Sequence, residues 1–276
     1  MGEQKTIRLA ILDLYEGHPN EGMRCIRQLL QQYARNNKLT LRCDEFDVRQ
    51  HSSLPDLSYD IYISSGGPGS PLDSVHTRWE KLYFEWLQSV ERYNNQPGND
   101  SKKQILFICH SFQLACRYFG VARVAKRRSP AFGVFPVHQL EGAKDEPLFA
   151  GLKDPFYAVD SRDYQVIQPN HRRLQELGAT LLAIEKERPH VPLERAIMAI
   201  RFNEHMIGTQ FHPEADAMGM ARYLQRDDRK KTVIENHGYE KWKSMIEQLN
   251  DPDKILYTQA HVIPNFLNQA VEQVAF

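Results

Sequence analysis

Hydrophobic positions in the first third of the chain follow two alternating patterns. Short apolar runs that predict buried strands lie at 7–12, 39–46 and 60–64. Apolar residues recur at helical spacing at 20–33, between the first two runs, and at 75–93, after the third. Strands that alternate with helices are typical of a parallel sheet covered by helices on both faces. We therefore predict an α/β fold for this part of the chain.

The pattern changes near the middle of the chain. Short β-like pieces at 132–137, 165–168, 180–184 and 196–202 are separated by turn-rich segments. This spacing predicts an antiparallel extension of the same sheet. The segment 185–195 carries two prolines and six charged residues, and we expect it to be an exposed connection without a catalytic part.

A helical region is expected in the last part of the sequence. Apolar residues form one helical stripe in 239–249, and 255–274 predicts a further helix that Pro264 interrupts. Because such a stripe must be buried, we predict a main domain at 1–225 and a helical C-terminal extension at 226–276 packed on it. A partner-docking surface and a lid over the active site are the alternatives, in that order.

The candidate chemistry begins at Cys109, where an apolar strand turns directly into a helix. The apolar run 105–108 precedes the cysteine, and the period then becomes helical up to a predicted stop at Gly120. A thiol at this turn projects from the carboxyl end of the sheet, beside helix N–H groups whose partial positive charge favours the thiolate. Such a thiolate can attack a carbonyl. The alternative is a structural cysteine, since free cysteine behaves as a small hydrophobe.

Two further segments supply the groups that a cysteine nucleophile needs. His212 follows a short predicted strand and Glu214 lies two residues beyond, so they fit the roles of base and orienting carboxylate. A loop at 65–71, rich in glycine and proline, follows the strand at 60–64. Its backbone N–H groups can approach a ligand without obstruction by a Cβ atom, which suits an oxyanion hole, although an ordinary turn is the simpler interpretation.

Together these segments resemble the class I, or triad, glutamine amidotransferases. The resemblance rests on Ser-Gly-Gly-Pro-Gly-Ser-Pro at 65–71, Phe-Ile-Cys-His-Ser-Phe-Gln at 107–113 and Phe-His-Pro-Glu at 211–214. It covers roughly residues 6–225 and implies a flavodoxin-like fold, with the main domain as the amidotransferase-like one.

The resemblance also implies a role for each matched residue. Cys109 would be the nucleophile, His212 the general base and Glu214 the group that orients it. The implied oxyanion and substrate-binding residues are Gly67, His110, Gln113 and Ser161. The backbone N–H groups of the first two would hold the oxyanion, the third would shape the glutamine pocket, and the fourth is a weak match beside the glutamine backbone.

Two positions depart from the family pattern. The family usually has glycine two residues before and two residues after the nucleophile, where this chain has Phe107 and Ser111. Serine is small, but the Phe107 ring falls where close strand packing or substrate access is expected, which bears on glutamine specificity. The His110 ring is expected to line the pocket or face solvent. Arg162 would pair with a substrate carboxylate or, more simply, form a surface ion pair.

Composition adds further limits on function. The 35 basic and 35 acidic residues balance, so nothing draws the whole chain to nucleic acid or a membrane. Four cysteines without a Cys-x-x-Cys pair, and no run long enough to span a bilayer, favour a reducing, cytoplasmic location. The eleven histidines lack the spacing of a zinc site, and no nucleotide-binding glycine motif follows a strand, so we expect neither a metal nor a cofactor.

The leading hypothesis is a stand-alone amidotransferase-like hydrolase that cleaves a γ-glutamyl amide through a Cys-His-Glu triad and a thioester, releasing ammonia or an amine. Its substrate would be glutamine or another γ-glutamyl compound, with a synthetase or other acceptor chain as a partner protein. Two alternatives remain: a catalytically silent binding or regulatory module on the same fold, and a cysteine peptidase of the related fold. Thiol reactivity tests the first alternative and substrate profiling the second.

Overall fold

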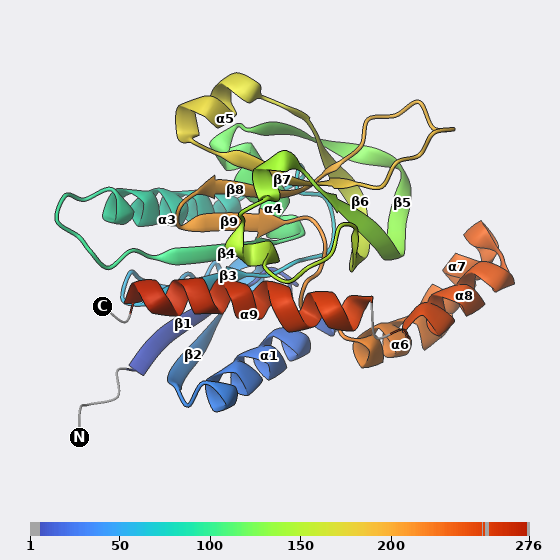
Figure 1. Ribbon diagram of the computed structural model, residues 1–276, viewed down its shortest axis with the longest axis horizontal. Helices are drawn as coiled ribbons and strands as arrows, with labels where there is room; N and C mark the ends of the chain where they lie inside the picture. The colour runs from blue at the N-terminus through green and yellow to red at the C-terminus, as the bar shows by residue number, and fades with distance from the viewer. Residues whose placement is uncertain (1–5, 250, 252–253, 275–276) are drawn as a thin grey trace.

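The computed structural model describes residues 6–249, 251 and 254–274, which contain one nine-stranded sheet with helices on both faces (Figure 1). The strand order is β2-β1-β3-β4-β9-β8-β7-β5-β6. The strands are β1 (Thr6–Asp13), β2 (Thr40–Asp47), β3 (Ile61–Ser64), β4 (Gln104–Ile108), β5 (Ala122–Gln139), β6 (Phe156–Pro169), β7 (Thr180–Glu185), β8 (Ile197–Asn203) and β9 (Met206–Thr209).

The sheet consists of a parallel half and an antiparallel half. Strands β2, β1, β3, β4 and β9 pair in parallel. Their order is the flavodoxin-like one, with β9 in the fifth position. Strands β8, β7, β5 and β6 continue the sheet by antiparallel pairing. The predicted flavodoxin-like α/β fold with its antiparallel extension is therefore confirmed.

Helices cover the two faces of the parallel half and bury separate apolar cores. Helices α1 and α9 pack on one face, and α3 and α4 pack on the other (Figure 1). The described helices are α1 (Gly22–Asn36), α2 (Val48–His51), α3 (Arg78–Asn94), α4 (His110–Phe119), α5 (His171–Leu177), α6 (Ala217–Gln225), α7 (Asp227–His237), α8 (Tyr239–Leu249) and α9 (Ile255–Val274), with short 3-10 helices at Glu141–Ala143 and Pro147–Phe149.

Strand β4 is buried on both of its faces. Leu106 and Ile108 belong to the core beside α1 and α9, whereas Ile105 and Phe107 belong to the core beside α3 and α4. This division follows from the alternation of side chains along a strand. Because β4 lies between β3 and β9, its carboxyl end opens inside the sheet and not at an edge.

Helix α9 runs without a break although Pro264 lies inside it. A proline removes one helical hydrogen bond and normally kinks or ends a helix. Apolar side chains on both sides of this proline are buried in the core: Val262, Ile263, Phe266 and Leu267. Their burial holds the two parts of the helix in line, and the predicted interruption at Pro264 was wrong.

Helices α6, α7 and α8 form a group at one end of the molecule, next to the beginning of α9 (Figure 1). Met220, Leu224, Val233 and Met245 from this group pack with Val159 of β6 in a third apolar cluster. The C-terminal helices thus bury their apolar stripes against the sheet by two routes, this cluster and the packing of α9. The domain boundary between residues 225 and 226 stays a prediction.

Candidate active site

Cys109 lies at a strained turn between β4 and α4. Its backbone has φ 49° and ψ −99°, a conformation that costs a non-glycine residue of order 1–3 kcal/mol. Hydrogen bonds hold it in place. The Cys109 N–H donates to Thr209 O in β9 at 2.7 Å, and the Cys109 carbonyl accepts from Gln113 N at 3.0 Å. The thiol is thereby fixed just beyond the carboxyl end of β4.

His212 follows the end of β9 and reaches the cysteine from the neighbouring strand. Its backbone N–H donates to Val159 O at 2.8 Å, which forms an isolated bridge to β6. The ring atom Nδ1 lies 2.8 Å from Glu214 Oε1, and the glutamate is buried, with 1% of the residue exposed. When Nδ1–H donates to the carboxylate, Nε2 is left for the nucleophile.

The charges around His212 set its protonation. Burial alone lowers the pKa of His212, but the neighbouring Glu214 carboxylate and Cys109 sulfur outweigh burial and raise that pKa well above the usual 6.5. The imidazole therefore holds its proton near neutral pH. A protonated ring beside the sulfur is the arrangement that a thiolate–imidazolium pair requires.

The glycine-rich loop after β3 lies against both of these side chains. A Cβ atom on Gly66 would lie 2.8 Å from His212 Cε1 and 3.6 Å from Cys109 Cβ. A Cβ atom on Gly67 would collide with the carbonyl oxygen of Leu14. Neither position accepts a side chain without movement of its neighbours, so the close approach of this backbone to the site requires glycine.

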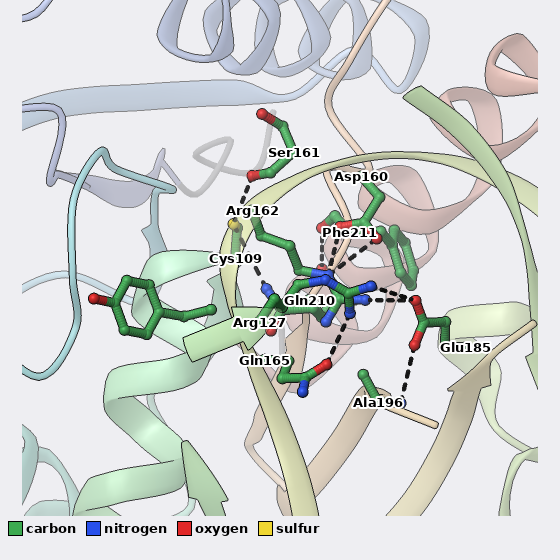
Figure 2. A network of polar contacts seen from close by, with 12 residues as sticks. Cys109, Arg127, Asp160, Ser161, Arg162, Gln165, Glu185, Ala196, Gln210 and Phe211 are labelled. Carbon is green, nitrogen blue, oxygen red and sulfur yellow. Dashed lines mark hydrogen bonds and ion pairs between the residues drawn. The ribbon is translucent and has the colours of Figure 1, made fainter. Parts of the chain in front are cut away.

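Two polar groups contact the Cys109 sulfur, one from the residue after β9 and one from β6. Gln210 Nε2 donates to Sγ at 3.6 Å, and Sγ donates to the Ser161 carbonyl oxygen at 3.8 Å (Figure 2). Gln113 Nε2 donates to Gln210 Oε1 at 3.0 Å and to Tyr164 O at 3.2 Å. Sequence reasoning missed Gln210, although its position directly before Phe-His-Pro-Glu was a signal that could have found it.

Tyr15, in the loop after β1, is a second site residue that sequence reasoning missed. Its hydroxyl lies 3.2 Å from the position that a Cβ atom on Gly66 would take. Burial, and then the neighbouring Glu214 and Cys109, raise the pKa of Tyr15 well above 10, so the phenol stays protonated. A neutral phenol can donate a hydrogen bond. Its sequence signal was its place beyond the carboxyl end of a parallel strand.

A single cavity of about 740 Å³ brings these groups together. It is bordered by Cys109, His212 and Glu214 and also by Gly67, His110, Gln113 and Ser161. All the site residues predicted from the sequence therefore border one cavity. Side chains of α6, α7 and α8 form part of its wall.

Neither a metal centre nor a membrane span is found among the described residues. No group of histidine, cysteine, aspartate or glutamate side chains among them is arranged to hold a metal ion. In that same part of the chain, no helix combines the length and the apolar character needed to cross a bilayer.

Comparison with known proteins identifies the family. The family model "glutamine amidotransferase class-I" matches residues 23–232. The chain belongs to the class-I glutamine amidotransferases. A search of curated proteins found no match to this sequence.

Solved structures share this amidotransferase's fold at low sequence identity. A glutamine amidotransferase from Thermotoga maritima is 16% identical, with a TM-score of 0.67 over 96% of this chain and 98% of that one. A second glutamine amidotransferase, from Methylobacillus flagellatus, is 12% identical, with a TM-score of 0.61 over 97% and 96% of the two chains. The glutaminase domain of the CTPS of Trypanosoma brucei, solved with bound acivicin, is 13% identical, with a TM-score of 0.60 over 96% and 94%.

Phe107 occupies a position where class-I amidotransferases usually have glycine, and it does so without filling the cavity. Its ring is fully buried in the core beside α3 and α4, edge to face with Phe202 at a centroid distance of 5.8 Å. Gly208 on the neighbouring strand leaves room for it, since a Cβ atom there would lie 3.2 Å from Phe107 Cβ. Phe107 does not border the cavity, so its ring does not obstruct the substrate.

Ser111, the second departure from the amidotransferase pattern, ties the turn to the sheet. Its hydroxyl accepts from Ile108 N at 2.8 Å and donates to Ser64 O at 2.7 Å. Serine at this position therefore supports the strained turn through a side chain that glycine lacks.

The His110 ring is buried, with 1% of the residue exposed, and therefore does not face solvent. Its Nε2 has no hydrogen-bond partner among the described residues. Burial, supported by the positive charges of Arg49 and Arg117, lowers the pKa of His110 to about 3. The ring is therefore neutral near neutral pH, and its low pKa makes it a weak base.

A buried network of charges anchors β6 behind the sulfur (Figure 2). Arg162 Nε donates to the two Asp160 carboxylate oxygens at 2.8 and 3.0 Å, and Arg162 Nη2 lies 3.4 Å from Glu185 Oε1. Glu185 also pairs with Arg127 and with Arg188, each at 3.1 Å. Arg162 thus belongs to an interior network, and the expected surface ion pair was wrong.

Proposed function

We propose that this amidotransferase hydrolyses a γ-glutamyl amide through a thioester on Cys109, with His212 as general base and acid and Glu214 as the orienting carboxylate. One observation carries the proposal: the sulfur, the imidazole and the carboxylate border the same cavity. His212 Nδ1 lies 2.8 Å from Glu214 Oε1, and the position of a Cβ atom on Gly66 lies 2.8 Å from His212 Cε1 and 3.6 Å from Cys109 Cβ. This order of nucleophile, base and orienting group suits acyl transfer.

In this reaction the sulfur attacks the carbonyl carbon of the amide. The backbone N–H groups of Gly67 and His110 stabilise the oxyanion, and Gln113 and Ser161 flank the glutamyl portion. The carbon–nitrogen bond then breaks as the proton held by His212 passes to the leaving nitrogen. Water, activated by the same ring, hydrolyses the thioester, which releases glutamate and restores the thiol.

Glutamine is the simplest substrate for this chemistry. Its ammonia would pass to a synthetase or other acceptor chain in the cytoplasm, whereas another γ-glutamyl compound would release an amine. The family supports glutamine amide hydrolysis in general, and the open cavity beside Cys109 is compatible with either compound.

Labelling and turnover test the proposal together. A diazoketone analogue of glutamine should alkylate Cys109, as detected by mass spectrometry of the intact and digested protein, and excess glutamine should slow the labelling. The wild-type protein should release glutamate from glutamine or from γ-glutamyl amides. Cys109→Ala should remove the label and lower turnover on the order of 10⁴-fold or more.

Cys43 provides the matched control, because its thiol is exposed and lies outside the cavity. Cys43→Ala should keep both the label and the turnover. A protein that takes no label at Cys109 and turns over no γ-glutamyl amide would instead be the catalytically silent module. Cleavage of ordinary peptide bonds without γ-glutamyl preference would favour the peptidase.

A further inference from the structure

The cavity is also bordered by apolar side chains that the hydrolysis of glutamine does not use. Val159 of β6, Met220 of α6, Val233 of α7 and Met245 of α8 border it, and each is more than nine-tenths buried. They belong to one apolar cluster, against which the half-buried Phe132 of β5 packs. We call these five residues the apolar wall.

The apolar wall lies on the His212 side of the site. The Val159 carbonyl accepts the His212 N–H at 2.8 Å, and α6, which carries Met220, begins at Ala217, shortly after Glu214. The leaving nitrogen must lie next to His212, because this ring supplies its proton. A substituent on that nitrogen would therefore extend along the apolar wall.

We propose that the substrate is a γ-glutamyl amide whose amine carries an apolar group, and that the apolar wall binds this group. The inference rests on the proposed hydrolysis and specifies its leaving group. The bond between sulfur and carbonyl carbon forms, the carbon–nitrogen bond breaks, and the His212 proton completes the departing apolar amine. Water then releases glutamate from the thioester.

The size of the cavity supports this substrate class. Its 740 Å³ lies within the range of roughly 300–1,000 Å³ that is typical of pockets for drug-sized ligands. Glutamine has no group beyond its amide nitrogen that could contact the apolar wall, so its binding would leave the small exposed part of these side chains uncovered. An apolar substituent would cover this part, which is the favourable direction of the hydrophobic effect.

Two of the acidic groups beside the cavity are not free to bind a cationic amine. Glu21 and Asp216 border the cavity near α1, and both are already paired with one guanidinium. Arg24 Nε lies 2.5 Å from Glu21 Oε2, and Arg24 Nη2 lies 2.7 Å from Asp216 Oδ1. A polyamine would have to compete with Arg24 for these two carboxylates, whereas an apolar amine would not.

The substrate preference of the wild-type enzyme tests the inference directly. The value of kcat/KM would be measured for glutamine and for the γ-glutamyl amides of methylamine, phenethylamine and diaminobutane. We expect the phenethylamide to exceed glutamine by about tenfold or more, with the methylamide between them. The cationic diaminobutane amide should be no better than the methylamide.

Two substitutions then assign the preference to the apolar wall. Met245→Ala should lower kcat/KM for the phenethylamide about tenfold and leave the value for glutamine within about twofold. Leu249→Ala is the matched control, since Leu249 is buried in the same cluster but does not border the cavity. It should leave the ratio of the two substrates unchanged, with thermal unfolding used to compare the stability of the variants.

The outcomes separate this inference from the proposed hydrolysis. A wild-type preference for glutamine or for the cationic amide would overturn the inference and leave the hydrolysis standing. The inference is also overturned, with the hydrolysis still standing, if Leu249→Ala changes the ratio of kcat/KM for the phenethylamide to that for glutamine as much as Met245→Ala does. If no γ-glutamyl compound acylates Cys109, the proposed hydrolysis fails and the inference fails with it.

Discussion

The parallel and antiparallel halves of the sheet contribute to the site in different ways. The parallel half ends at the site in strained, closely packed backbone, as the φ of 49° at Cys109 and the contact of Gly67 with Leu14 show. Its strands are held by apolar side chains on both faces. In the antiparallel half, by contrast, β6 rests on a buried network that includes Arg162 and Glu185.

This contrast indicates how chemistry and stability are divided in the fold. Functional groups in open α/β sheets gather at the carboxyl ends of the parallel strands. The antiparallel half contributes a backbone carbonyl, that of Ser161, to the surroundings of the sulfur. Substitutions in the charge network should therefore lower mainly stability, and substitutions at the parallel end should lower mainly activity. Three substitutions test this division.

The largest expected effect on stability comes from Glu185→Gln in the antiparallel half. This change keeps the size of the side chain but leaves three arginines without their shared carboxylate. Breaking a buried ion pair typically costs about 3–5 kcal/mol of unfolding free energy. Urea unfolding should show this loss at pH 7, while kcat/KM of the folded variant changes by less than about threefold.

The pH dependence and a surface control sharpen this test. Burial raises the pKa of Glu185, but Arg162 and Arg127 outweigh it and leave the pKa below 4.5. The stability from its charge is present above pH 4.5 and is lost as pH falls through the lowered pKa, so wild type and variant should converge in acid. Glu187→Gln, whose side chain is 74% exposed beside Arg195, should change stability by at most about 1 kcal/mol. Equal losses in the two variants would count against the network.

Gly67→Ala should have the next largest effect, and at the parallel end it should appear in the rate. The added methyl group collides with the Leu14 carbonyl and displaces a backbone N–H that the proposed mechanism uses. Loss of one oxyanion donor costs about 2.7–4 kcal/mol of transition-state stabilisation, or a hundredfold or more in kcat. Steady-state kinetics with the preferred γ-glutamyl amide measures it.

Gly69→Ala separates this loss from general damage to the loop. Gly69 has φ +83°, so a side chain there is strained, but its Cβ atom would meet only Arg49 Nη2, at 3.9 Å, among the described residues. The variant should lose about 1 kcal/mol of stability and keep most of its activity. If both variants lose activity equally, Gly67 has no specific part in catalysis.

The sequence predicted the parallel half because strand and helix periods differ clearly there. The strand expected at 7–12 is observed at Thr6–Asp13, and the helix expected at 75–93 begins at Arg78, where Thr77 caps it. The Pro264 helix was misjudged because local propensity contains no information on burial. Likewise, Glu185 was expected in an exposed segment, since its partner Arg127 lies 58 residues away in the sequence.

The site was predictable where its residues form contiguous motifs. Cys109, His212 and the glycine loop each follow a recognisable strand, so topology alone places them at one edge of the sheet. Gln210 and Tyr15 make their contacts through side-chain directions that the pattern of apolar residues does not determine. The apolar wall was unpredictable for the same reason, because three separate helices must come together to form it.

His110→Leu tests an exception to the division, because this buried polar ring lies in the parallel half. With a pKa of about 3 in the folded protein and 6.5 as its ordinary value, the unfolded chain binds the extra proton between these pH values. Stability from the neutral ring is therefore complete above pH 6.5 and falls as the pH is lowered, by about 2 kcal/mol at pH 5. Urea unfolding at pH 7 and pH 5 measures the free energy of unfolding of both proteins. Between these pH values the wild type should lose about 2 kcal/mol more than His110→Leu does. His205, whose pKa burial also lowers, is present in both proteins and cancels in the difference. If the unfolding free energies of the two proteins change equally between pH 7 and pH 5, His110 is not held neutral by its surroundings.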